Sequence, residues 1–327
     1  MTAPHTAAER AFAVEYVLPL RWEHDDGIDE LGEYLRRLNA WVDVTIVDGS
    51  PPHRYEAHRR AWPEVRHLPP AVPGLNGKAR GAMTGIQAAR HDLVIVADDD
   101  VRYSYEALRA LIDRMAGADL VRPQNVFEPM PWHARWDTGR TLINRAFGGD
   151  YSGTLALRRN ALPPEGYDTD VLFENLELER TVRACGGRVR IARDIYIARR
   201  PPTAARFLEQ RVRQAYDSLG QPARSLAELS LLPVAVWAFR RPARRLSVIV
   251  TATVAIAAWG RYRDRGAAHF PASAVLWAPL WVAERALTAW TVPLVRMRGG
   301  VRYRDTRITT AAHSTRRLTR HCKEARS

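Results

Sequence analysis

The feature that most constrains the fold is a regular alternation of short apolar runs and helical patterns between about residues 13 and 200. Val14 to Leu18 predicts a strand ended by Pro19, and apolar side chains from Ile28 to Trp41 then recur at helical spacing. Further strands are predicted at residues 42–47, 65–68 and 93–97. Strands that alternate with helices in this way indicate an α/β fold, with a mostly parallel sheet covered by helices on both faces.

Acidic residues follow two of the predicted strands. Asp48 ends the second strand in Asp48-Gly49-Ser50, and Asp98-Asp99-Asp100 directly follows the strand at 93–97. Helices are predicted from Gly77 to Ala89 and after Ser104, whose side chain suits an N-cap. Ligands of parallel sheets bind beyond the carboxyl ends of the strands, so both acidic segments are candidates for a binding site.

The Asp98–Asp100 triplet is a candidate metal site. Clustered carboxylates supply the oxygen ligands that hard divalent cations prefer, and Mg²⁺ or Mn²⁺ held there would keep positions open for phosphate. Such a cation would neutralise a diphosphate leaving group. The alternative is a solvated acidic turn before the next helix.

Two further segments could contact a nucleotide. The Asp48 carboxylate could accept hydrogen bonds from a base or ribose, although the same residues would also suit an ordinary Asp-Gly turn. Lys78 lies in Asn76-Gly77-Lys78-Ala79-Arg80-Gly81, which opens the helix before the acidic strand, and a helix N-terminus with cationic side chains suits phosphate. The segment has neither Walker spacing nor a GxGxxG pattern.

In this order, the segments resemble the inverting family 2 glycosyltransferases of GT-A fold, from about Val14 to Tyr216. Val17-Leu18-Pro19-Leu20 is similar to the opening strand of that family, Asp48 to its strand-end aspartate and Gly77-Lys78 to its Gly-Lys helix. Asp98-Asp99-Asp100 is similar to its DxD motif. The resemblance implies donor binding by Pro19, Asp48, Lys78, Asp98 and Asp99, and metal binding by Asp98 and Asp100.

The acidic segment 172–179 is similar to the family segment that usually contains Glu-Asp, in which the aspartate is the general base. This sequence has Asn175 at that place, and an amide cannot take a proton. We therefore expect Glu174 to be the base, with Glu177 and Asp150 as alternatives.

A QxxRW-like motif completes the resemblance. Gln210 and Arg213 match it, whereas Gln214 stands where tryptophan is expected. The match implies that Gln210 and Arg213 bind the departing diphosphate of the donor.

Basic charge is concentrated in the last third of the chain. The formal net charge is +13, and residues 201–327 contain 22 Arg and Lys against 7 Asp and Glu. Mainly apolar stretches at 246–260 and 270–295 interrupt the basic residues. The first would be about 22 Å long as a helix, shorter than the roughly 30 Å of hydrocarbon in a bilayer. Glu284-Arg285 and three prolines are expected to break the second.

We therefore expect helices that lie in the membrane plane or re-enter it, with tryptophans at the headgroup level and arginines on anionic lipid. A spanning hairpin and a soluble helical subdomain are the alternatives. The segment Arg298–Tyr303 is similar to those that follow the hydrophobic helices of membrane-bound family members, which implies a lipid-linked acceptor. Nucleic acid is not an expected partner, because the basic residues lack a zinc-finger, RNP or recognition-helix pattern.

Cysteine content and the N-terminus bear on location. Cys185 and Cys322 have no partners at metal-ligand spacing, so we expect two unpaired thiols in a reducing compartment. The first twenty residues lack the pattern of a signal peptide. We expect an N-terminal tail at 1–12, a catalytic domain at 13–220, a membrane-associating helical region at 221–297 and a basic tail at 298–327.

Together these observations predict a membrane-associated bacterial glycosyltransferase of the cell envelope, on the cytoplasmic side of the cell membrane. It would move a sugar from a nucleoside-diphosphate sugar to a hydroxyl of a lipid-linked acceptor, with Mg²⁺ or Mn²⁺ as cofactor. The alternatives are a nucleotidyltransferase and, because of Asn175, a catalytically impaired donor-binding or scaffold protein.

Overall fold

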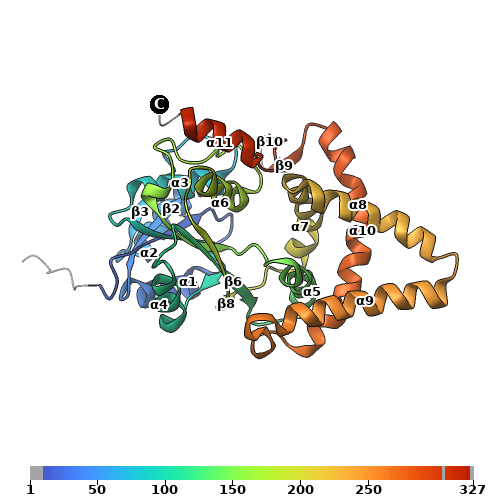
Figure 1. Cartoon of the computed structure of the whole chain (residues 1–327). Coiled ribbons are helices and arrows are strands. Elements are labelled where there is room, and N and C mark those ends of the chain that lie inside the picture. The colour runs from blue at the N-terminus through green and yellow to red at the C-terminus, as the bar shows by residue number, and fades with distance from the viewer. Residues whose placement is uncertain (1–9, 304–305, 325–327) are drawn as a thin grey trace, which may run out of the picture.

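A single mixed sheet forms the centre of the computed structural model, which describes residues 10–303 and 306–324 (Figure 1). In the described residues its strand order is β3-β2-β1-β4-β7-β6-β8-β5. The strands are β1 Glu15–Leu20, β2 Asp43–Asp48, β3 Arg66–Leu68, β4 Leu93–Ala97, β5 Val101–Arg102, β6 Leu120–Phe127, β7 Thr154–Arg158 and β8 Val189–Arg199.

Most strand pairs are parallel. Strands β3, β2, β1 and β4 run in one direction, β6 and β8 are parallel to each other, and β7 is antiparallel to both β4 and β6. Each face of the sheet has its own core, with α1 (Ile28–Asn39) and α4 (Tyr105–Arg114) on one side. Helices α3 (Gly77–Ala88) and α6 (Glu174–Ala184) cover the other side, which confirms the predicted α/β arrangement.

Pro19 does not end the first strand as predicted. It lies inside β1 and pairs with Val47 of β2, whereas β4 pairs with β1 only as far as Val17. Pro19 therefore lies beyond the β4 ladder, where its missing N–H group interrupts nothing.

Glycines let α3 lie directly on β1. A Cβ added to Gly85 would be 2.2 Å from Cγ1 of Val17, and one added to Gly81 would be 3.0 Å from Cβ of Pro19. These contacts require glycine, because any side chain would push the helix away from the sheet. The N-terminus of α3, with Lys78, is thereby held at the carboxyl end of β1.

Helices dominate the region after β8. They are α7 Ala204–Asp217, α8 Pro222–Ala238, α9 Pro242–Tyr262 and α10 Ala278–Met297, which join α5 (Trp132–Phe147) from the earlier part of the chain. Figure 1 shows α8 and α9 as an antiparallel hairpin that projects from the body of the molecule, with α10 packed across its base.

Two expectations about these helices are wrong. The 21 residues of α9 make a helix of about 31 Å, longer than predicted, because it begins before the apolar run and continues past it. Glu284-Arg285 and Pro293 do not break α10. Arg285 is fully buried and its charge faces Glu228, 3.6 Å away, so the pair lies between helices instead of interrupting one.

The segment that we expected as a basic tail is folded in the residues described. It forms β9 (Val301–Tyr303), β10 (Thr306–Ile308) and α11 (Thr315–Glu324), and α11 packs against α6. Residues 1–9 of the expected N-terminal tail lie outside the described residues.

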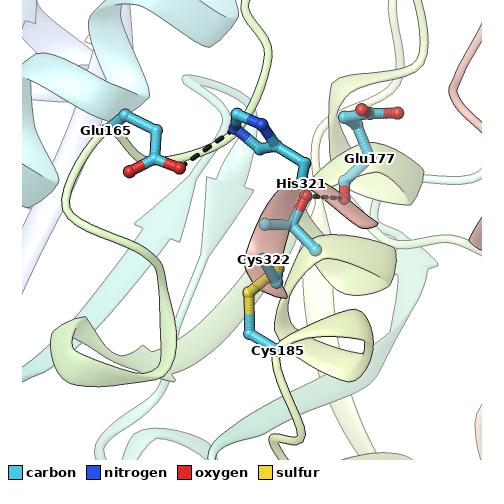
Figure 2. The surroundings of a disulfide bond; sticks show 6 residues. Glu165, Glu177, Cys185, His321 and Cys322 are labelled. Carbon is cyan, nitrogen blue, oxygen red and sulfur yellow. Dashed lines mark hydrogen bonds and ion pairs between the residues drawn. A yellow bond between two sulfur atoms is a disulfide. The ribbon is translucent and has the colours of Figure 1, made fainter. Parts of the chain in front are cut away.

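The prediction of two unpaired thiols is wrong, because Cys185 and Cys322 form a disulfide (Figure 2). Leu318 and Cys322 lie one turn apart on the buried face of α11, and docking this face on α6 brings Cys322 to the end of that helix. A sequence separation of 137 residues gives no sign of this contact.

Candidate active site

Three charged side chains meet at the carboxyl edge of the sheet. The Nζ atom of Lys78 is 2.6 Å from Oδ1 of Asp98 and 2.7 Å from Oε1 of Glu174. Lys78 lies in the first turn of α3, Asp98 follows β4, and Glu174 begins α6. We call these three residues the Lys78 cluster. It joins three segments that the sequence predicted to be functional.

Asn76 holds two of these segments together. Its Oδ1 accepts hydrogen bonds from the backbone N–H groups of Lys78 and Ala79, which caps α3. Its Nδ2 donates to the carbonyl oxygen of Val171, in the loop before Glu174. Asn76 is fully buried, so both loops are fixed relative to each other.

The ion pairs set the protonation states of the cluster. Burial by itself lowers the pKa of Lys78, but the charges of Asp98 and Glu174 outweigh it and raise this pKa above its usual value. Burial raises the pKa of Glu174, but the charge and hydrogen bond of Lys78 outweigh it and lower the pKa. Glu174 is therefore a carboxylate at neutral pH, as a general base must be.

The aspartate triplet makes different contacts at each residue. Nε of Arg199, at the end of β8, donates to Oδ2 of Asp100 over 2.8 Å, and its Nη2 is 3.6 Å from Oδ2 of Asp98. Asp99 instead accepts a hydrogen bond from Nε1 of Trp22. Burial, opposed by Arg199 and assisted by the neighbouring aspartates, raises the pKa of Asp100 to about 6.

Asp98 and Asp100 fit a divalent cation. Oδ1 of Asp100 is buried and has no hydrogen-bond partner, so an acceptor oxygen at this edge remains available. A Cβ at Gly153 would be 2.7 Å from Oδ2 of Asp98, so glycine keeps space beside this carboxylate. No group of three or more His, Cys, Asp or Glu in metal-binding geometry occurs within the described residues. Two carboxylates leave the remaining coordination positions to phosphate oxygens or water.

Asp48 is placed differently from the expectation of a base or ribose contact. Its carboxylate is buried and accepts from Nδ1 of His58 over 2.7 Å, from Nε2 of His67 over 3.2 Å and from the N–H of Ser50. Burial raises its pKa, but these donors lower it well below the usual range. In this arrangement its oxygens orient α2 (Pro52–Ala61) and β3 and are not exposed to a ligand.

Glu177 and Asp150, the alternative bases, have structural partners. Glu177 is buried and accepts from the backbone N–H of His313 over 2.7 Å and from Nδ1 of the same residue over 2.8 Å. Asp150 accepts from Arg140 and Thr141, each over 2.7 Å. Both carboxylates stabilise contacts within the fold. Of the three candidate bases, Glu174 is the one that belongs to the Lys78 cluster.

The remaining predicted donor-binding residues lie at two places. Pro19 is partly exposed in β1 beside α3. Gln210 and Arg213 line a cavity between α7, the end of α10 and the β9–β10 hairpin. Asn175, which stands at the family's usual base position, donates from Nδ2 to the carbonyl of Ser152.

Sequence reasoning missed Arg199, Trp22 and Asn76 as members of this site. Arg199 and Trp22 reach the triplet through folding of distant segments, and their neighbours in sequence carry no motif. Asn76 could have been found, because an asparagine directly before a predicted helix suits an N-cap.

One solved structure shares this fold over most of both chains. A solved mannosyltransferase from Pyrobaculum calidifontis, in complex with GDP-Man and Mn²⁺, matches 88% of this chain and 90% of its own with a TM-score of 0.52 and 18% identity. The chain has the GT-A fold, as predicted.

The sequence then identifies the family of the catalytic region. Residues 29–162 match the family described as Glycosyl transferase family 2, and this part of the chain is a glycosyltransferase domain of that family. No curated protein gives a significant match.

Two other solved structures match smaller parts of the chain. Glucosyl-3-phosphoglycerate synthase from Mycobacterium tuberculosis covers 59% of this chain and 72% of its own, with 18% identity and a TM-score of 0.40. Mannosyl-3-phosphoglycerate synthase from Rubrobacter xylanophilus covers 64% and 75%, with 14% identity and a TM-score of 0.42.

Proposed function

We propose that this chain transfers a sugar from a nucleoside-diphosphate sugar to a hydroxyl group of a lipid-linked acceptor, at the cytoplasmic face of a membrane. The observation that carries the proposal is the Lys78 cluster. It places a cation and two carboxylates at the carboxyl edge of a family 2 glycosyltransferase sheet.

The donor would bind at this edge with a divalent cation. Asp98 and Asp100 would hold Mg²⁺ or Mn²⁺, and the mannosyltransferase that shares the fold is solved with GDP-Man and Mn²⁺. The cation, when bound, supplies positive charge that stabilises the departing diphosphate. Lys78 adds a second positive charge beside Asp98.

Glu174 would act as the general base. The acceptor hydroxyl oxygen forms a bond to the anomeric carbon of the sugar while the bond from that carbon to the diphosphate oxygen breaks. The Glu174 carboxylate takes the hydroxyl proton, and the nucleoside diphosphate leaves with the bonding electrons. Attack opposite the leaving group inverts the anomeric centre.

The α8–α9 hairpin would bring the enzyme to the membrane. Val236 and Trp237 on α8 are 60% and 50% exposed, Phe239 directly after this helix is 66% exposed, and Val248 on α9 is 62% exposed. Within the described residues, one helical stretch, Pro242–Ala268, has the length and apolar composition needed to cross a membrane, and 17% of its most apolar window is buried.

Charge at the tip of this hairpin favours an in-plane position over a spanning one. Four arginines lie at this tip: Arg240 and Arg241 in the turn, and Arg244 and Arg245 at the start of α9. Moving them through hydrocarbon would be costly, whereas anionic headgroups would attract them. We therefore propose that the hairpin lies in the interface with its apolar side chains inserted.

Donor turnover tests the proposed activity. The full chain, supplied with Mn²⁺ and a panel of nucleotide sugars, is expected to release nucleoside diphosphate from at least one of them. Asp98→Asn should lower this turnover by about a hundredfold or more, because a cation contributes several kcal/mol to such a step.

Asp92→Asn is the matched control. Asp92 lies before the same strand on the surface and pairs with Arg158, so its loss should leave turnover unchanged. Absence of both hydrolysis and transfer for every donor, or release of pyrophosphate from nucleoside triphosphates in its place, would overturn the proposal.

A further inference from the structure

A cavity of about 530 Å³ lies between α7, the C-terminal end of α10 and the β9–β10 hairpin. Arginines dominate its described lining, with one carboxylate among them: Arg206, Arg213, Arg298, Arg302, Arg307 and Glu209. We call this cavity the arginine pocket. Three separate segments supply its charge, so the sequence does not show it as a motif.

Four arginines of this pocket have no carboxylate partner within the described part of the chain. Arg206, Arg213, Arg298 and Arg307 form no ion pair with a described carboxylate. Arg213 lies 4.9 Å from the ring centre of Tyr303, and Arg307 donates to the carbonyl oxygen of Gly300. Guanidinium groups that outnumber the one carboxylate of the described lining, Glu209, favour a ligand with several anionic oxygens, such as a phosphate.

Arg213 links the pocket electrostatically to the Lys78 cluster. Glu174 has its pKa raised by burial and lowered by Lys78, and the charge of Arg213 lowers it further. Arg213 therefore lies within electrostatic reach of the proposed base while it also lines the pocket.

The surface beside the pocket is apolar. Exposed side chains follow one face of α10 down to its C-terminal end: Leu280, Leu287, Trp290, Leu294 and Met297. Val212, which lines the pocket, and Leu208 one turn earlier are exposed on α7. A charged cavity that opens onto an apolar stripe fits a ligand with an anionic head and a long hydrocarbon chain.

We propose that the arginine pocket binds the phosphate of a lipid-linked acceptor, with the lipid chain lying along the exposed face of α10. The inference rests on the proposed glycosyltransferase function and assigns its acceptor side. The phosphate or diphosphate that joins such a lipid to the head group bearing the acceptor hydroxyl offers several anionic oxygens to these guanidinium groups. A polyprenyl monophosphate carries the same kind of anionic group and hydrocarbon chain without the acceptor hydroxyl, so it serves as a probe of binding alone.

Vesicle binding by the full chain, without any nucleotide sugar, tests this proposal. Phosphatidylcholine vesicles carry a polyprenyl monophosphate, or the same mole fraction of phosphatidylglycerol, or of polyprenol without phosphate. The wild-type chain should prefer the polyprenyl monophosphate vesicles, and polyprenol should add nothing to plain phosphatidylcholine.

The double variant Arg206→Gln/Arg298→Gln should lower the preference for polyprenyl monophosphate over phosphatidylglycerol by about tenfold or more, given the strength of charge-assisted hydrogen bonds. Both residues are exposed, and no described contact of their side chains supports the fold. Arg240→Gln/Arg241→Gln, which removes the same charge from the hairpin tip, should weaken binding to both vesicles equally.

An unchanged preference in the pocket variant, or an equal loss on both vesicles, would overturn the acceptor site and leave a general anionic surface. Donor turnover is measured separately, so an absence of turnover with a retained preference would count against the proposed activity alone. A wild-type chain that shows no preference would overturn the pocket without the use of any variant.

Discussion

The Lys78 cluster and the arginine pocket both lie within reach of Arg213, but they hold charge in opposite ways. In the cluster, each charge has a partner of opposite sign at 2.6 or 2.7 Å, and these partners are partly or fully buried. In the pocket, four described arginines have no carboxylate partner, and most of them are exposed. Charges that are already paired keep fixed positions and protonation states, whereas charges without partners remain free to bind an incoming anion.

The contrast extends to the apolar side chains around each site. The sheet beneath the Lys78 cluster has two buried cores, whereas the large exposed apolar side chains gather on α8, α9 and α10. The first region resembles the interior of a soluble enzyme, and the second resembles a surface that is covered by something else. The two regions therefore suit the two substrates of a transfer reaction.

Removal of the proposed base from the Lys78 cluster should have the largest effect on activity. Glu174→Gln is expected to lower the rate of sugar transfer by about a thousandfold, because general base catalysis contributes between a hundredfold and ten thousandfold. Donor binding should persist, because Asp98 and Asp100 remain. Steady-state transfer and calorimetric donor titration measure the two effects.

Glu177→Gln is the control on the same helix. It weakens the contacts to His313, so the free energy of unfolding should fall by about 1–3 kcal/mol. The turnover of the protein that remains folded should be unchanged. Equal activity losses in the two variants would refute the assignment of Glu174.

Removal of the disulfide should have the next largest effect, which is on stability. Cys322→Ser removes a cross-link that closes a loop of 137 residues, so the free energy of unfolding should fall by about 2–5 kcal/mol. Wild-type protein in excess reductant should reach the same stability in urea unfolding. If reductant leaves the wild-type stability unchanged, the bond makes no contribution.

The state of this bond also reports on location. Reducing compartments keep thiols reduced, so a disulfide in protein alkylated at the moment of lysis would oppose the proposed cytoplasmic face. Bonds between Glu177 and His313 hold the same segment on α6 without the disulfide, so reduction should loosen α11 without unfolding the sheet.

The exposed apolar side chains at the tip of the α8–α9 hairpin are tested by vesicle binding. Trp237→Ser/Phe239→Ser should weaken binding to anionic vesicles by about tenfold or more, because burial of each large apolar side chain contributes roughly 1.5–3 kcal/mol. Leu226→Ser, an exposed apolar residue near the start of α8, is the control and should have a smaller effect. Vesicle sedimentation of the full chain measures both.

Truncation near residue 225 would not replace this experiment. It removes α10, which packs on α5 and α7, and α11, which is covalently joined to α6. Equal vesicle binding by Trp237→Ser/Phe239→Ser and by Leu226→Ser would show that the hairpin tip does not insert.

Local patterns in the sequence are enough to predict the sheet and the position of Lys78 and Asp98 at its edge. Local apolar runs and helical spacing specify β1, α1, β2, α3 and β4, and the carboxyl ends of these strands meet at one edge, so Lys78 and Asp98 could be expected there. The choice of Glu174 over Glu177 was open in the sequence. The two residues lie one turn apart, and their partners, Lys78 and His313, are distant in sequence.

Other features of the molecule could not be predicted from local patterns, because they depend on packing between segments that are distant in sequence. The enclosure of Asp48 by two histidines, the Cys185–Cys322 bond and the burial of Arg285 against Glu228 are of this kind. The arginine pocket also depends on such packing, since α7, α10 and the β9–β10 hairpin bring their arginines together only after folding. Composition could place the basic charge in the last third of the chain, but docking of these elements decides which arginines converge on one cavity.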